Sequence, residues 1–321
     1  MPLIQNSSYR HPRWLPNGHA QTIYPSLFRR VPHFTNREER LELPDGDFLD
    51  LEWAENGRGK LAILSHGLEA NTRTDYIQGM AAALLKNGWD VLAWNFRGCS
   101  RETNRLLQMY HSGATADLHG VVQHALQNHP AKSVDLIGFS LGGNLTLKYL
   151  GERPEELPGE IHRAVAFSVP CDLACSSHQL AARSNRIYME RFLRKMKEKV
   201  RAKNHRFPGE LDLTGLEAMR TFQEFDDRFT APIHGFQNAA DYWKRNSCRQ
   251  FLSSIRIPTL LVNAANDPFL GPGCYPREEA EGNEYFHLEI PESGGHVGFP
   301  TFGASGIYWS EQRALDFLSN G

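Results

Sequence analysis

The chain has 321 residues, of which 40% are hydrophobic and 22% are charged, and its formal net charge is −2 at pH 7. This composition is typical of a soluble globular protein and excludes a fibrous or intrinsically disordered chain. The nearly neutral charge gives no reason to expect a nucleic-acid partner.

Hydropathy and cysteine usage predict a cytoplasmic protein. The first residues, MPLIQNSSYRHPRWLPNG, lack the apolar stretch of roughly 7–15 residues that marks a signal peptide. No segment approaches the roughly 18 apolar residues of a membrane span. The five cysteines are irregularly spaced, so we expect reduced thiols and no disulfide framework.

Residues 1–35 are rich in proline, arginine and aromatic residues, and we expect an extended arm on a single domain that spans residues 1–321. The segment LELPDGDFLDLEWAE at 41–55 alternates around Asp45-Gly46 and predicts a β-hairpin. Beyond it, strand-like and helix-like segments follow one another. Strands are predicted at 60–67, 89–96, 133–139 and 164–170, and helices at 75–88, 114–130 and 141–152.

This alternation predicts an α/β fold with a mostly parallel central sheet and helices on both faces. Residues 171–255 interrupt the alternation, because they contain helical patterns and no clear strand. We predict that they form a helical cap or lid inserted over the sheet. Strands at 257–267 and 284–290 then resume the sheet, and a helix at 308–320 closes the chain.

One predicted helix of this insertion, RIYMERFLRKMKEKVRAK at 186–203, is basic and amphipathic. Its apolar face consists of Met189, Phe192, Leu193, Met196 and Val200. The other face carries eight lysine or arginine residues. Such a helix can make peripheral contact with an anionic membrane surface. A cap helix with a solvated charged face is the favoured interpretation.

The stretch DLIGFSLGG at 135–143 places Ser140 between two glycines, directly after a predicted strand and before a predicted helix. This is the setting of a nucleophile elbow, a sharp turn that exposes a serine hydroxyl. Gly138 and Gly142 would let the strand and helix backbones approach closely. The helix start also offers backbone N–H groups to an oxyanion. We therefore predict that Ser140 is a nucleophile.

A serine nucleophile needs a base, which a carboxylate orients, and here the expected chain order is Ser, Asp or Glu, then His. Asp267 follows the predicted strand TLLVNAAN, and His296 follows the last strand in ESGGHVGF. Asp172 is a rival carboxylate after the preceding strand. His287 is a rival histidine, but it lies inside a strand pattern. We predict Asp267 and His296 as the partners of Ser140.

The predicted oxyanion hole uses two backbone N–H groups. One belongs to Leu141, which follows the nucleophile, and the other to Leu68 in the loop after strand 60–67. We expect the His66 imidazole to pack within that loop. No cofactor or metal is predicted, because the chain has no H-E-x-x-H motif and no G-x-x-x-x-G-K-[ST] phosphate loop, and the Cys171/Cys175 pair lacks a second pair.

Together these features resemble the α/β-hydrolase superfamily and, more narrowly, its YheT-like branch of esterases, lipases and alcohol acyltransferases. The matching segments are NGHAQTIYP at 17–25, HGLE at 66–69, NFRGCS at 95–100, GFSLGGN at 138–144, FDDRFTAPIHGF at 225–236 and AANDPF at 264–269. The first and fifth are the most specific to the branch. The resemblance covers nearly the whole chain.

The resemblance implies a catalytic triad of Ser140, Asp267 and His296. It also implies that Asn95, Arg97 and Asp226 or Asp227 brace loops near the site. Many members of the branch have a glycine where this chain has Arg101.

We therefore expect a serine carboxylic-ester hydrolase that forms an acyl-enzyme with a small-molecule ester or lipid, either a short- to medium-chain ester or an acylglycerol-like lipid. Phe192, Phe222 and Phe225 of the insertion predict an apolar acyl pocket. An alcohol O-acyltransferase would use the same intermediate. A non-catalytic binding protein on this fold is the third alternative.

Overall fold

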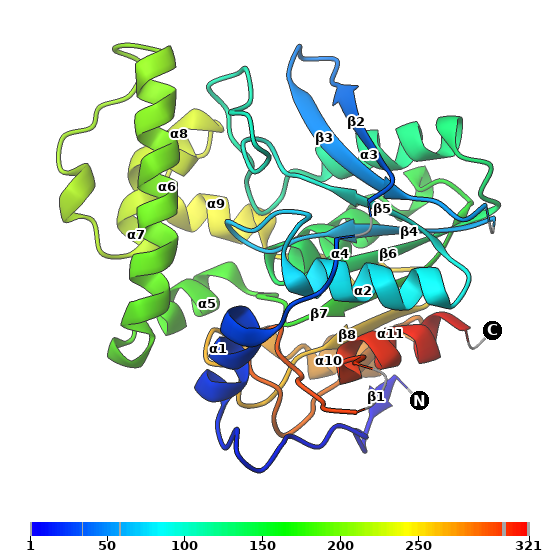
Figure 1. Ribbon diagram of the computed structural model, residues 1–321. Helices are drawn as coiled ribbons and strands as arrows, with labels where there is room; N and C mark the ends of the chain where they lie inside the picture. The colour runs from blue at the N-terminus through cyan, green and yellow to red at the C-terminus, as the bar shows by residue number, and fades with distance from the viewer. Residues whose placement is uncertain (1, 34, 58, 304–305, 320–321) are drawn as a thin grey trace.

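The computed structural model describes residues 2–33, 35–57, 59–303 and 306–319, and a nine-stranded sheet forms its centre (Figure 1). The strand order is β1-β9-β8-β7-β6-β4-β5-β3-β2. The strands are β1 (Leu3–Ile4), β2 (Arg37–Glu42), β3 (Phe48–Ala54), β4 (Lys60–Ser65), β5 (Asp90–Trp94), β6 (Ser133–Phe139), β7 (Ile161–Phe167), β8 (Thr259–Val262) and β9 (Phe286–Glu289). β3 pairs antiparallel with β2 and β5, and all other neighbours are parallel. The predicted hairpin and mostly parallel sheet are thus confirmed.

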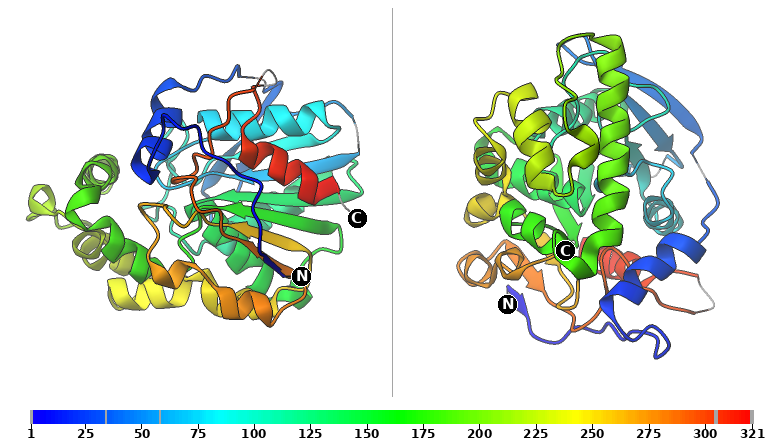
Figure 2. Two further views of the ribbon diagram at one scale, coloured as in Figure 1. Left: turned by 90° about the horizontal axis from the view of Figure 1, so that it is seen from below. Right: turned by 90° about the vertical axis from the view of Figure 1, so that its left-hand side faces the viewer.

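Helices cover both faces of the sheet, because its central strands are apolar on both sides. In β4, Leu61 and Ile63 enter one hydrophobic core, and Ala62 and Leu64 enter the other. Helices α2 (Asp75–Lys86) and α11 (Trp309–Ser319) contribute to the second core, and α3 (Thr115–Asn128), α4 (Leu141–Glu152) and α10 (Arg277–Glu281) to the first. The left view of Figure 2 shows α2 and α11 above the sheet.

Residues between β7 and β8 form a group of helices at one end of the sheet, drawn in green to yellow in Figure 1. They are α5 (Leu173–Leu180), α6 (Arg186–Arg206), α7 (Phe222–Phe225), α8 (Ala231–Ile233) and α9 (Ala239–Asn246). These helices share a hydrophobic cluster of their own, in which Val200, Phe225 and Phe229 are almost completely buried. Residues 171–255 contain no strand.

The basic helix α6 does not offer its apolar face to a membrane. Met189, Leu193 and Val200 are buried in the cluster of the helical insertion, and Phe192 and Met196 pack against it. The expectation of membrane contact through this face is therefore wrong. The favoured alternative, a cap helix, agrees with the structure, except that Lys197 and Lys203 of its charged face are buried. Across the described ranges, no helix combines the length and apolar character required to cross a membrane.

The N-terminal segment differs from the extended arm expected from sequence. Residues Leu3–Ile4 add β1 to the edge of the sheet beside β9, and Gly18–Phe28 form helix α1. The Asn17 side chain caps this helix by accepting a hydrogen bond from the Ala20 N–H at 2.9 Å. Helix α1, blue in Figure 1, lies beside the lower end of α6.

Candidate active site

Ser140 occupies a strained turn between β6 and α4. Its backbone angles are φ 53° and ψ −119°, a conformation that L-residues rarely adopt. A Cβ atom at Gly138 would lie 2.5 Å from the Gly142 carbonyl oxygen, and one at Gly142 would lie 2.4 Å from the His66 carbonyl oxygen. Both positions therefore require glycine. The strand, sharp turn and helix have the geometry expected of a nucleophile elbow.

A continuous chain of hydrogen bonds links Ser140, His296 and Asp267. Ser140 Oγ lies 2.9 Å from His296 Nε2. His296 Nδ1 lies 2.9 Å and 3.1 Å from the two carboxylate oxygens of Asp267. The Asp267 side chain is fully buried, and its Oδ1 also accepts a hydrogen bond from the Phe269 N–H. The carboxylate is thus fixed against the imidazole, which in turn faces the serine hydroxyl.

The rival residues serve other parts of the fold. Asp172 caps α5 by accepting a hydrogen bond from the Cys175 N–H at 2.9 Å. His287 lies within β9, where its ring contacts Phe317. The structure therefore brings Asp267 and His296 to Ser140 and places Asp172 and His287 elsewhere.

The two N–H groups predicted for an oxyanion hole border the same pocket as Ser140, because Leu68 and Leu141 both line it. Leu141 is the first residue of α4, whose leading N–H groups have no acceptor within the helix. Contacts on both sides fix the loop that carries Leu68. The Gly67 N–H donates to Tyr76 Oη at 2.8 Å, and the Glu69 N–H donates to Tyr110 Oη at 3.0 Å.

His66 and two lysines of α6 also fix the loop that carries Leu68. His66 is fully buried, and its two ring nitrogens bond the Gly67 carbonyl and the Phe96 N–H. Burial lowers the pKa of His66 to about 3, so the ring is neutral and packs in the loop as expected. From α6, Lys195 bonds the Glu69 carbonyl oxygen at 2.8 Å, and Lys199 bonds the Glu69 carboxylate at 2.9 Å. The helical insertion is therefore directly connected to the loop that carries Leu68.

The pocket in front of Ser140 is mainly apolar. Residues of the insertion contribute much of its wall, namely Leu173, Leu180, Phe192, Met196, Phe222 and Trp243. Phe192 and Phe222 thus line it as expected, whereas Phe225 packs inside the cluster of the insertion. Phe269 stacks on His296, with ring centroids 4.1 Å apart. Such a pocket suits an apolar acyl chain.

Helix α1 contacts the site through side chains that sequence reasoning missed. Gln21 is completely buried, and its Oε1 accepts hydrogen bonds from the Gly294 N–H at 2.8 Å and from the Asn266 amide at 3.0 Å. Thr22 Oγ1 accepts a hydrogen bond from the His296 N–H at 2.8 Å. Helix α1 therefore fixes both the loop that carries His296 and the residue before Asp267. The branch-specific segment NGHAQTIYP contains both side chains and was the available signal.

We predict that Thr22→Val lowers kcat by about tenfold and leaves KM nearly unchanged, because the loop that carries His296 loses its anchor while the pocket wall is retained. Steady-state kinetics on a soluble ester measures both constants. The matched control is Thr22→Ser, which keeps the accepting hydroxyl. An equal loss of activity in both variants would show that the hydrogen bond is not responsible.

The family resemblance implies structural roles for Asn95 and Arg97, and both side chains bond neighbouring loops. Arg97 forms two hydrogen bonds with Asp117 at 2.7 Å and 2.8 Å, and a third at 2.6 Å with Asp45 of the β2–β3 turn. The Asn95 side chain accepts a hydrogen bond from the Thr72 N–H at 3.1 Å. These contacts tie the loop after β5 to its neighbours.

Asp226 lies in the pocket wall, and its side chain is almost completely buried. Its carboxylate accepts hydrogen bonds from Thr230 Oγ1 at 2.6 Å and from Trp243 Nε1 at 2.8 Å. Burial nevertheless raises the pKa of Asp226 to about 7, because the two hydrogen bonds only partly offset the lost hydration. The folded protein therefore keeps a proton on this carboxyl over a pH range in which the unfolded chain releases it.

The raised pKa predicts that Asp226 lowers stability as pH increases. Between about pH 4 and pH 7 the folded state binds one more proton than the unfolded state, so the free energy of unfolding falls by up to about 4 kcal/mol across this window. Melting temperatures at pH 5 and pH 8 should differ less in Asp226→Asn than in the wild type. The control Asp227→Asn should keep most of the wild-type slope, and an unchanged slope in Asp226→Asn would contradict the prediction.

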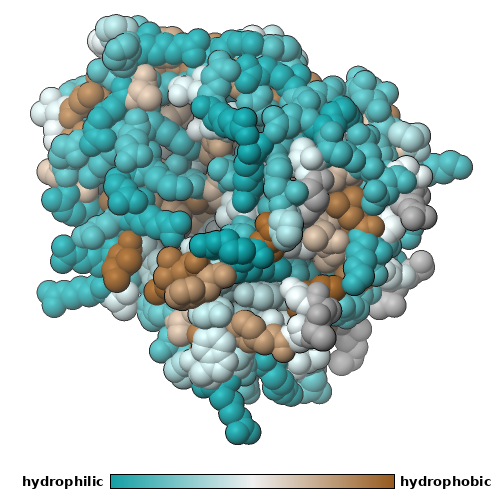
Figure 3. Space-filling model, viewed as in Figure 1, coloured by the Kyte–Doolittle hydropathy of each residue, from teal (hydrophilic) through white to brown (hydrophobic). Residues whose placement is uncertain are grey.

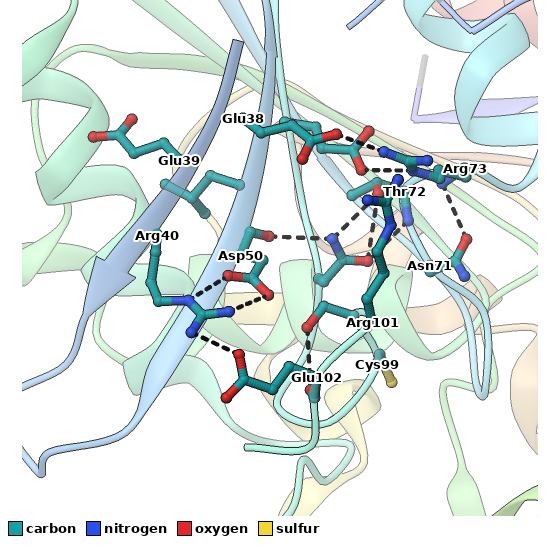
Figure 4. A pocket seen from close by; sticks show the side chains of 14 residues that line it. Glu38, Glu39, Arg40, Asp50, Asn71, Thr72, Arg73, Cys99, Arg101 and Glu102 are labelled. Carbon is teal, nitrogen blue, oxygen red and sulfur yellow. Dashed lines mark hydrogen bonds and ion pairs between the residues drawn. The ribbon is translucent and has the colours of Figure 1, made fainter. Parts of the chain in front are cut away.

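A second hollow is strongly polar and lies between the β2–β3 hairpin and the loop after β5 (Figure 4). Its charged side chains pair with one another: Arg40 with Asp50 at 2.8 Å and with Glu102 at 2.9 Å, and Arg73 with Glu38 at 2.6 Å and with Glu52 at 3.2 Å. Ligand atoms of His33, Glu38 and Glu52 lie within 4.8 Å of one another. Because Arg73 already occupies both carboxylates as an ion-pair partner, we assign no metal to this cluster.

Comparison with known proteins gives consistent matches. A family model described as alpha/beta hydrolase fold matches residues 62–301. The chain is 36% identical to "Putative esterase YheT" of Escherichia coli over 317 residues, which cover 96% of this chain and 92% of that protein. It is 27% identical to human "Phospholipase ABHD3", covering 92% of this chain and 74% of that one. The solved esterase Pf2001 of Pyrococcus furiosus superposes with a TM-score of 0.60 at 20% identity, covering 91% of this chain and 97% of that chain.

Proposed function

The chain belongs to the alpha/beta hydrolase fold family and is an ester-hydrolysing enzyme, and we propose that it acts as a serine carboxylic-ester hydrolase through Ser140, His296 and Asp267. The observation that carries this proposal is the unbroken hydrogen-bond chain from the Ser140 hydroxyl through the His296 ring to the buried Asp267 carboxylate. The position of Ser140 on the elbow also supports the proposal, because the strained turn exposes its hydroxyl at the N-terminus of α4.

In the first half of the reaction, neutral His296 accepts the Ser140 proton at Nε2 as Oγ attacks the acyl carbonyl carbon. Asp267 holds the tautomer with the proton on Nδ1 and stabilises the imidazolium. The N–H groups of Leu68 and Leu141 stabilise the oxyanion of the tetrahedral intermediate. The imidazolium then gives its proton to the leaving alkoxide as the ester C–O bond breaks, and the alcohol departs from the acyl-enzyme.

In the second half, water takes the place of the alcohol. His296 accepts a proton from the water as its oxygen attacks the acyl carbonyl, and a second oxyanion forms in the same position. Collapse of this intermediate breaks the bond to Ser140 Oγ, which regains its proton from His296. The carboxylic acid is released and the enzyme returns to its starting state.

The apolar pocket and the similarity to a phospholipase support acyl esters, including acylglycerol-like lipids, as the substrate class. We further propose that residues 171–255 are the lid of this pocket, since α5, α6, α7 and α9 all contribute to its wall. Initial rates on p-nitrophenyl esters of graded chain length test the proposal. Adding an alcohol and measuring the fraction of acyl ester product tests whether the acyl-enzyme prefers water or an alcohol. If the protein hydrolyses none of these esters, the proposed chemistry is rejected.

Met196 on α6 is expected to limit the acyl chain that fits. Met196→Trp fills part of the pocket, so we expect kcat/KM for long-chain esters to fall about tenfold relative to the acetate ester. Met196→Leu conserves the volume and should keep the wild-type preference. An unchanged chain-length profile in Met196→Trp would show that the acyl chain binds elsewhere.

A further inference from the structure

Helix α1 has an exposed apolar side that the proposed hydrolytic chemistry does not use. We define the α1 patch as the exposed residues Trp14, Ile23, Leu27, Phe28 and Phe302. Phe28 is 64% exposed and Trp14 is 55% exposed, although both are large apolar side chains. In Figure 3, brown side chains gather on the lower left part of the molecule, where α1 lies in the same view of Figure 1.

Ring contacts join the three aromatic residues of the patch through the half-buried Tyr24. The Tyr24 ring centroid lies 4.7 Å from that of Trp14, 5.0 Å from that of Phe28 and 5.7 Å from that of Phe302. On the opposite side of α1, Gly18, Gln21 and Pro25 are buried, and Gln21 bonds the loop that carries His296. The helix therefore has one side that the protein covers and an opposite side whose apolar residues are exposed. An uncovered cluster of aromatic side chains marks an interaction surface.

The charge around the patch favours an anionic partner. Residues 1–33 contain four arginines and no aspartate or glutamate. Of these arginines, Arg29 pairs with the buried Glu311, and Arg30 lies 3.8 Å from Asp75. Arg13 and Arg30 are exposed and flank Trp14 and Phe28 in the sequence. From α6, Arg191 is also exposed and reaches Ser26 of α1 at 3.4 Å. Aromatic side chains bordered by arginines match an anionic lipid surface, where rings enter the headgroup region and guanidinium groups pair with phosphates.

A series of short contacts connects helix α1 to the pocket. His19 of α1 bonds Tyr188 Oη at 3.1 Å, and the Tyr188 ring packs on Phe269 with centroids 4.7 Å apart. Phe269 lines the pocket and stacks on His296. A lipid surface that contacts α1 would therefore lie beside the pocket wall.

We propose that the α1 patch docks the protein on an anionic lipid surface. This binding is separate from the hydrolytic chemistry and does not depend on it. The membrane contact is thus made by α1 and its arginines, and not by the apolar face of α6, which the insertion buries.

Vesicle co-sedimentation tests the docking surface, using full-length protein carrying Ser140→Ala so that hydrolysis does not consume the lipid. The probes are phosphatidylcholine vesicles with and without phosphatidylglycerol. We expect binding to the phosphatidylglycerol vesicles that weakens by about tenfold or more in Trp14→Ser/Phe28→Ser and in Arg13→Glu/Arg30→Glu. The control Tyr285→Ser removes an exposed ring outside the patch and should bind as the parent does.

Circular dichroism and melting temperature establish that each variant is folded before binding is compared. Because the two double variants change different chemistry, a folding defect in one leaves the other as a test. Absence of binding to either vesicle would overturn the proposal, as would equal binding by all variants. A parent protein that is dimeric in light scattering and becomes monomeric in Trp14→Ser/Phe28→Ser would also overturn it, because a second copy would then be the occupant.

Discussion

Replacing Ser140 with alanine is expected to lower kcat for ester hydrolysis by about ten-thousandfold to a millionfold. The variant removes the only atom that forms the acyl-enzyme in the proposed reaction, and water would have to attack the ester without a covalent intermediate. The methyl group keeps the turn accessible, because the strained backbone already tolerates a Cβ atom there. Initial rates on the best p-nitrophenyl ester measure the effect.

A serine at the other end of the same strand provides the matched control. Ser133 is the first residue of β6, and Ser133→Ala should keep wild-type kcat. Near-wild-type turnover in Ser140→Ala would contradict the proposed role of the elbow. Equal losses in both variants would point to damage of β6 instead of loss of a nucleophile.

Asp267→Asn is expected to lower kcat by about ten-thousandfold. The wild-type carboxylate accepts the Nδ1 proton, whereas an amide NH₂ in its place donates to Nδ1 and favours the opposite tautomer. Nε2 then carries the proton and no longer accepts one from Ser140. Rates on the same ester measure the loss, and the melting temperature separates it from unfolding.

Asp172→Asn is the control for Asp267→Asn, since Asp172 was the rival carboxylate. Its side chain caps α5, and asparagine is also a good N-cap residue, so both activity and stability should change little. A large loss of kcat in Asp172→Asn together with a small loss in Asp267→Asn would reverse the assignment of the carboxylate.

The sequence predicted the features of the site that depend on local pattern or chain order. Ser140 could be proposed because the glycines on both sides and the flanking strand and helix are contiguous in the chain. Asp267 and His296 could be proposed because each follows a strand of the parallel sheet, and such strand ends meet at one edge. The alternation of apolar segments likewise predicted the layers of the fold.

Helix α1 was missed because its local sequence argues against a helix. Pro25 lies inside it, and proline removes a backbone donor, so the segment was interpreted as extended chain. The helix is stabilised instead by tertiary contacts, such as those of Gln21 with Gly294 and Asn266, which are distant in the sequence. No local periodicity encodes such contacts.

The charged face of α6 differs from expectation for a similar reason. Sequence pattern treats lysine as solvated, yet Lys203 is almost fully buried and bonds the Asn104 carbonyl oxygen at 2.8 Å. The environment that accepts this charge comes from a loop roughly a hundred residues earlier, as the separation of 99 positions shows. Lys199 likewise bonds a residue distant in the sequence, Glu69, and this contact joins the insertion to the loop that carries Leu68.

Intact-protein mass spectrometry after exposure to a fluorophosphonate probe tests the nucleophile most directly. The wild type should gain the mass of one probe adduct, because His296 is placed to accept the Ser140 proton as Oγ attacks the phosphorus atom. Ser140→Ala should gain none under the same conditions. An adduct retained by Ser140→Ala, or no adduct on the folded wild type, would contradict a nucleophilic Ser140.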